Sequence, residues 1–106
     1  MPLGFDGSEG KAILLSQAVD MTTLYRTLNP GKVLSCFLGR TALETLLNQP
    51  NAKGIRFYYG LVGETPQLVA VSADAAENDQ IGDGHIVVDE GVGGPPRGGL
   101  PNVLNS

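Results

Sequence analysis

The sequence predicts a small α+β protein: a small antiparallel sheet built on a central β-hairpin, two short helices packed on one face of it, and flexible Gly/Pro-rich termini. The hairpin is indicated by an alternating apolar stretch that a short turn separates from a second β-prone stretch. The helices are indicated by two stretches with apolar residues at helical spacing. With 106 residues the chain can enclose one hydrophobic core.

The first helix is predicted over residues 17–28, with Ser16 as its N-cap. Asn29-Pro30-Gly31 ends it, because proline disfavours helix in the residue before it and glycine permits positive φ. One face of this helix carries residues at i, i+3, i+4, i+7 and i+10, which are Ala18, Met21, Thr22, Tyr25 and Leu28.

The next elements are an apolar strand at 32–38 and a short helix at 42–48. Thr41 and Glu44 have the spacing of a capping box, in which each side chain accepts a hydrogen bond from the other residue's backbone N–H. Pro50 ends this helix.

The hairpin is predicted to pair 55–61 with 67–73, flanked by 32–38 or by a further strand at 85–89. Residues 1–10 are predicted to be a flexible arm, 11–90 a single domain, and 91–106 a Gly/Pro-rich tail that forms no packed element. The predicted core is Ala18, Met21, Tyr25, Leu28, Leu43, Leu46, Leu47, Ile55, Phe57, Tyr59, Leu68 and Ala70.

Composition narrows the possible partners and locations. Eleven acidic residues against seven Lys and Arg give a net charge of −4, and no basic cluster exists to bind a phosphate backbone, so nucleic acid is not an expected partner. No segment has the apolar length of a membrane span, and residues 1–10 do not resemble a signal peptide. Cys36 is the single cysteine, which excludes an internal disulfide and a multi-cysteine zinc site. We therefore expect a cytoplasmic protein without a cofactor.

Residues 79–90 place Asp79, Asp83 and Glu90 at positions one, five and twelve of a calcium loop. Ile81 and Val87 stand where oxygen ligands belong, so calcium binding is kept as an alternative beside an ordinary acidic loop. A Cys36–His85 pair with an acid would be a nucleophilic site, and it is the second alternative. A small buried thiol and a surface histidine explain the same residues.

Arg56 and Tyr58 alternate with the predicted core residues of the first hairpin strand, so they point away from the core. They form an interaction surface unless the N-terminal arm or the tail covers them. Few strands leave sheet edges that invite pairing with another chain. The sequence therefore favours a non-catalytic protein-interaction or self-assembly module, a homo-oligomer or filament subunit, over an enzyme.

Four segments in this order resemble a family of small, uncharacterised bacterial proteins: MTTLYRTLNPG, FLGRTALETLLNQP, GIRFYYGL and PQLVAVSADAAEND. The resemblance covers a little over half of the chain and implies a fold but no known activity. Members of that family often end in a Cys-Pro-Pro segment, where this chain has Gly94-Pro95-Pro96-Arg97. A redox or metal role of those cysteines therefore does not carry over.

Overall fold

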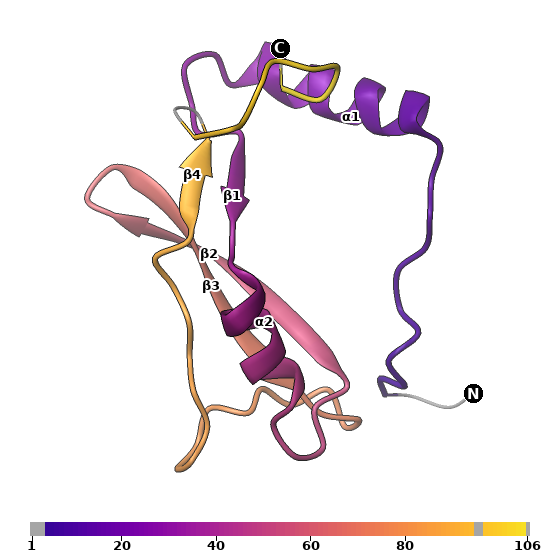
Figure 1. Cartoon of the computed structure of the whole chain (residues 1–106), viewed down its shortest axis with the longest axis vertical. Coiled ribbons are helices and arrows are strands. Elements are labelled where there is room, and N and C mark those ends of the chain that lie inside the picture. The colour runs from indigo at the N-terminus through magenta and orange to yellow at the C-terminus, as the bar shows by residue number, and fades with distance from the viewer. Residues whose placement is uncertain (1–3, 95–96, 106) are drawn as a thin grey trace. The chain divides into compact units, whose positions relative to one another are not determined.

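A computed structural model of the chain describes residues 4–94 and 97–105. These residues form two compact units, one from residues 4–9 with Leu38–Gly91 and one from Gly10–Phe37 with residues 92–94 and 97–105. The elements in chain order are α1 (Leu15–Leu28), β1 (Ser35–Phe37), α2 (Arg40–Leu47), β2 (Gly54–Val62), β3 (Thr65–Ala73) and β4 (Val92–Gly94) (Figure 1). Two helices and two antiparallel sheets confirm the predicted α+β class.

The hairpin of the first unit is confirmed. β2 and β3 pair in antiparallel register from Gly54 opposite Ala73 to Val62 opposite Thr65. The turn between them has two residues, and Gly63 takes a φ of 61°, which fits a turn with glycine at its first central position. Both strands are longer than predicted, because this tight turn lets pairing continue up to it.

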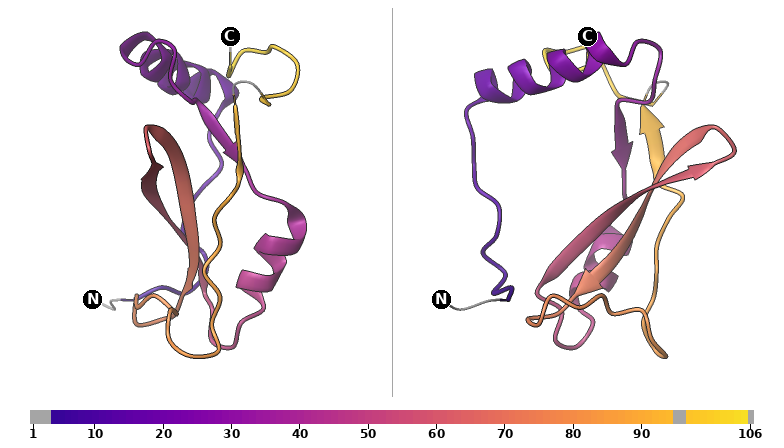
Figure 2. Two further views of the ribbon diagram at one scale, coloured as in Figure 1. Left: turned by 90° about the vertical axis from the view of Figure 1, so that its left-hand side faces the viewer. Right: turned by 180° about the vertical axis from the view of Figure 1, so that it is seen from behind.

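α2 covers one face of the hairpin, as the views in Figure 2 show. The helix begins at Arg40 with Gly39 as N-cap, so the predicted capping box of Thr41 and Glu44 is wrong. Thr41 lies inside the first turn, and Glu44 forms an exposed ion pair with Arg40 at 3.3 Å. Leu46, with no exposed surface, is the only residue of α2 that is buried.

The segment after β3 closes the outer edge of that strand. Gln80 N–H donates to the Ser72 carbonyl at 2.9 Å, and Ala70 exchanges two backbone hydrogen bonds with Val88 at 2.7 and 3.0 Å. The strand predicted at 85–89 is therefore wrong in extent, since it is reduced to a single bridge at Val88. The polar loop between the two contact points prevents a continuous ladder.

In the second unit, β1 and β4 pair antiparallel from Ser35 opposite Gly94 to Phe37 opposite Val92. The prediction that residues 91–106 build no packed element is wrong at β4. Glycine is required there for close approach, because a Cβ on Gly94 would lie 2.5 Å from Ser35 Oγ. Pro95 and Pro96, predicted to be part of an extended tail, lie outside the described residues.

α1 also belongs to the second unit. It begins one residue before the predicted N-cap: Leu14 is the N-cap, and its N–H donates to Gln17 Oε1 at 2.9 Å. The predicted end is confirmed, because α1 stops at Leu28 and Gly31 takes a φ of 75°. Arg26 Nη1 donates to the Leu104 carbonyl at 2.6 Å and so holds the C-terminal segment against the helix.

The apolar core is smaller than predicted. Only Leu46 and Ala70 of the twelve predicted core residues are buried, together with Val71 and Ala73. α1 has no buried residue, and Tyr59 in β2 is 95% exposed. The sequence pattern placed these apolar residues on common faces of α1 and β2. Most of them are nevertheless exposed among the described residues.

Candidate interaction surface

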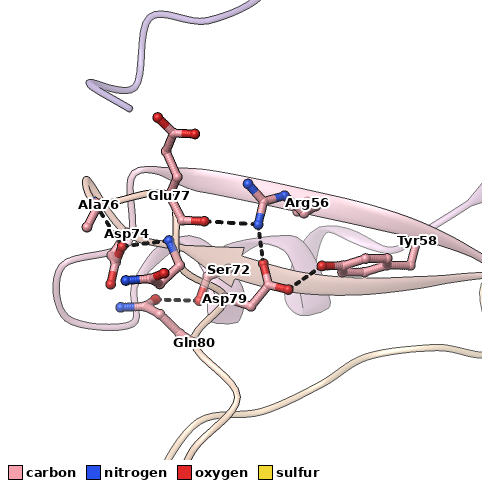
Figure 3. Close-up of polar contacts among 9 residues, drawn as sticks. Arg56, Tyr58, Ser72, Asp74, Ala76, Glu77, Asp79 and Gln80 are labelled. Carbon is pink, nitrogen blue, oxygen red and sulfur yellow. Dashed lines mark hydrogen bonds and ion pairs between the residues drawn. The ribbon is translucent and has the colours of Figure 1, made fainter. Parts of the chain in front are cut away.

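Asp79 joins the two side chains that the sequence singled out. Arg56 Nη1 donates to Asp79 Oδ1 at 2.5 Å, and Tyr58 Oη donates to Asp79 Oδ2 (Figure 3). Arg56 Nη1 also donates to the Glu77 carbonyl at 3.2 Å. Alternation along β2 puts Arg56 and Tyr58 on the same face, and the turn after β3 brings Asp79 to them. The cluster therefore fixes the loop after β3 to β2.

The same contacts shift the acid–base equilibria of the cluster. The pKa of Asp79 is lowered from 3.8, first by the hydrogen bond from Tyr58 and then by Arg56, which together outweigh partial burial. The pKa of Tyr58 is raised from 10.0, because its hydroxyl donates to the Asp79 carboxylate and ionisation would put two negative charges together. At neutral pH the cluster thus holds an ionised carboxylate between a cation and a neutral phenol.

The N-terminal arm covers part of this face. The Phe5 ring lies 5.3 Å from the Arg56 guanidinium, in the geometry of a cation–π contact, and Phe5 N–H donates to the Ala75 carbonyl at 2.9 Å. A hollow of about 280 Å³ lies between the arm and the start of β2, and its lining includes Glu9 and Lys53 but no Cys, His, Ser or Thr. The interaction surface at Arg56 and Tyr58 stays a prediction, since both side chains have partners within their own unit.

A buried polar network, which the sequence did not reveal, ties α2 to β3 and the loop. Gln49 Nε2 donates to Ser72 Oγ at 2.6 Å, and Ser72 Oγ donates to Gln80 Oε1 at 2.5 Å. Gln80 Nε2 donates to the Pro50 carbonyl at 2.8 Å, and Gln49 Oε1 accepts from Ile86 N–H at 2.8 Å. Each polar side-chain group of Gln49, Ser72 and Gln80 has a hydrogen-bond partner, so this network is structural.

The three candidate calcium ligands do not form a site within the described residues, where no group of three acidic, His or Cys side chains comes together. Both carboxylate oxygens of Asp79 are already bonded to Arg56 and Tyr58. Asp83 and Glu90 are exposed. Calcium binding through these residues stays a prediction without support from a described contact.

Cys36 and His85 lie in different units, so neither unit contains the pair that a nucleophilic site would need. Cys36 is half-buried in β1, between two exposed residues. His85 Nδ1 is buried, and it has no hydrogen-bond partner among the described residues. The Cys36–His85 site therefore stays a prediction without support from a described contact.

Two strips of large apolar side chains remain exposed. The α1 strip consists of Met21, Leu24, Tyr25 and Leu28, which fall within an arc of about 100° at 3.6 residues per turn. The hairpin strip consists of Phe57, Tyr59 and Leu61, on one face of β2. No charged residue belongs to either strip. Exposed apolar surface of this kind marks interaction sites.

No helix of the described chain combines the length and the apolar character needed to cross a membrane. Comparison with known protein families, curated proteins and solved structures found no match.

Proposed function

We propose that this chain is a non-catalytic interaction module that assembles with copies of itself. The observation that carries the proposal is the balance between buried and exposed apolar side chains. Among the described residues, the buried apolar side chains are only Leu46, Ala70, Val71 and Ala73, while the α1 strip and the hairpin strip are exposed. A chain that leaves this much apolar surface in water gains stability when a partner covers it.

The accessible surface supports the same conclusion. The chain exposes 8016 Å², whereas a compact monomer of this mass exposes about 5,700 Å². Two separate compact units of half the mass would together expose about 6,800 Å². The observed value exceeds even this sum for two separate units. Such an excess is typical of proteins that complete their burial in an assembly.

A reducing cytoplasm fits the proposal, because Cys36 would remain a free thiol there. The Asp79 cluster and the buried Ser72 network are both engaged in contacts within the first unit. A binding module needs no further chemistry from them.

The oligomeric state of the full-length chain tests the proposal. Light scattering coupled to size-exclusion chromatography, over a wide range of protein concentration, is expected to give a mass that is a multiple of 11.1 kDa. The full chain is required, because removing the C-terminal tail would remove β4, the partner of β1. A strict monomer at every concentration would refute the proposal.

A further inference from the structure

The outer edge of β2 is an unpaired row of backbone donors and acceptors. Ala70 and Ser72 direct their backbone groups away from β2, toward Val88 and Gln80. Their register partners in β2 are Phe57 and Ile55, and in an antiparallel pair such partners both point outward. Backbone groups alternate in direction along a strand, so the N–H and C=O groups of Tyr59 and Leu61 also point outward. None of these four residues has a backbone partner at this edge among the described residues.

The two edges of the hairpin differ in protection. The β3 edge is covered by the segment that includes Gln80 and Val88, and it also carries Pro66, which lacks a donor. β2 has neither proline nor lysine, which are the usual blocks on an exposed edge. Its single charged side chain, Arg56, is bonded to Asp79. The hairpin is therefore closed on one side and open on the other.

A two-stranded hairpin is only marginally stable by itself, and further strands stabilise it. The sequence of β2, GIRFYYGLV, is rich in β-branched and aromatic residues, as a central strand would be. An antiparallel pairing of β2 with itself also meets no like charge, because the only charged residue is near one end of the strand. A second copy of this chain therefore fits the open edge.

The N-terminal arm selects the register. It lies beside the start of β2, where an added Cβ on Gly7 would be 3.3 Å from the Lys53 carbonyl oxygen. The exposed stretch begins at Phe57 and ends at Val62, with half-buried Gly60 within it. A two-fold axis at Tyr59 keeps the pairing within this stretch. It places Tyr59 opposite Tyr59, Phe57 opposite Leu61, and Tyr58 opposite Gly60 of the second copy.

We propose that β2 pairs antiparallel with β2 of a second copy about a two-fold axis at Tyr59, forming a four-stranded sheet from two hairpins. This inference rests on the proposed self-assembly and names its interface. The pairing forms about six backbone hydrogen bonds across the axis. It also joins the two hairpin strips into one continuous apolar face, because opposed residues of paired strands share a face.

Tyr59→Pro tests the edge without breaking the hairpin. The Tyr59 N–H points outward, so proline removes a donor that β3 does not use, and edge strands accept proline at such positions. The dissociation constant of the oligomer is expected to rise at least about tenfold, since the loss occurs on both sides of the axis. Tyr59→Ser, which keeps the N–H, is the matched control and should weaken association less. Equal association of Tyr59→Pro and wild type would overturn the proposal.

Disulfide trapping tests the register even if the proline variant folds poorly. In a Cys36→Ser background, Tyr59→Cys places two thiols at the axis, where the Cα atoms of a hydrogen-bonded pair are about 5.5 Å apart and a disulfide can form. Mild oxidation should give a covalent dimer, whereas Tyr58→Cys should give none. Trapping only through Tyr58→Cys, through both, or through neither would overturn the register at Tyr59.

These results separate the two proposals. If wild type assembles, Tyr59→Pro assembles equally well and Tyr59→Cys gives no covalent dimer, the β2 interface is wrong and self-assembly stands. If wild type is monomeric, self-assembly itself is wrong.

Discussion

Among single residues, Asp79 connects the loop after β3 to the hairpin. It accepts from Arg56 and Tyr58 on β2 while its backbone position bridges to Ala73 on β3. One residue thus connects the loop to both strands of the hairpin, to β2 through its carboxylate and to β3 through its backbone. Arg56 in turn touches Phe5 in the N-terminal arm, so the charge state of Asp79 bears on that contact as well.

Acid should weaken this cluster selectively. The pKa of Asp79 is lower in the folded chain than its ordinary 3.8, so the unfolded chain binds the proton first as pH falls. The stabilisation is therefore complete above about pH 4 and is lost as pH decreases below that value. Urea unfolding across this range should show a steeper loss for wild type than for Asp79→Asn. Asp83→Asn, which removes an exposed carboxylate, is the control and should keep the wild-type profile.

Ser72 is the buried residue on which the polar network depends, with no exposed surface. Ser72→Ala leaves Gln80 Oε1 without its donor and removes the acceptor of Gln49 Nε2. Because both groups are partly or fully buried, the free energy of unfolding should fall by about 1–3 kcal/mol. Chemical denaturation measures it, with the exposed Ser16→Ala as control. A loss as small as that of the control would show that water replaces these bonds at no cost.

Among the elements, β4 shows why a strand can be hidden in a glycine-rich segment. Its backbone approaches β1 so closely that Leu34 N–H donates to the Gly94 carbonyl at 2.6 Å. This approach depends on the absence of a side chain at Gly94. The glycine content that makes this segment resemble a flexible linker is therefore needed to pack β4 against β1.

Gly94→Ala should therefore disrupt the β1–β4 pair. The new Cβ would lie 2.5 Å from Ser35 Oγ and 2.9 Å from Gly98 Cα, and overpacking of this kind costs about 1–3 kcal/mol. Hydrogen exchange at the Leu34 amide should become faster. Gly93→Ala is the matched control, because its Cβ would meet Val33 Cγ1 at 3.4 Å. Unchanged protection of Leu34 in Gly94→Ala would contradict the packing argument.

The elements also show what the sequence could predict. Alternation of apolar residues and a short turn with Gly63 were sufficient to predict the hairpin. Asn29-Pro30-Gly31 was sufficient to predict the end of α1. Both signals depend on residues that are close together in the sequence. β4 was missed because its partner lies more than fifty positions away in the chain. Arg56 and Tyr58 were found by alternation, but Asp79 as their common partner depends on the path of a loop that no periodicity describes.

Across the whole molecule, the helical and strand patterns identified the apolar faces but not what covers them. The four residues of the α1 strip are a regular helical face, and no described residue of the second unit buries them. Core assignment from periodicity assumes that a face is buried by the same chain. Where a second copy supplies the cover, the same pattern marks an interface. The pairing proposed above for β2 is a different contact, because it uses the edge of the strand and joins two apolar faces side by side.

Each unit combines segments that are separated in the chain: the second consists of Gly10–Phe37 and Val92–Ser106, and the whole hairpin lies between them in sequence. On the ribosome, the hairpin and α2 are complete before β4 has been synthesised. β1 therefore lacks its hydrogen-bonding partner until residues 92–94 have emerged. The segments of the first unit are thus synthesised before β4, and the edge of β1 stays open to other strands during that interval.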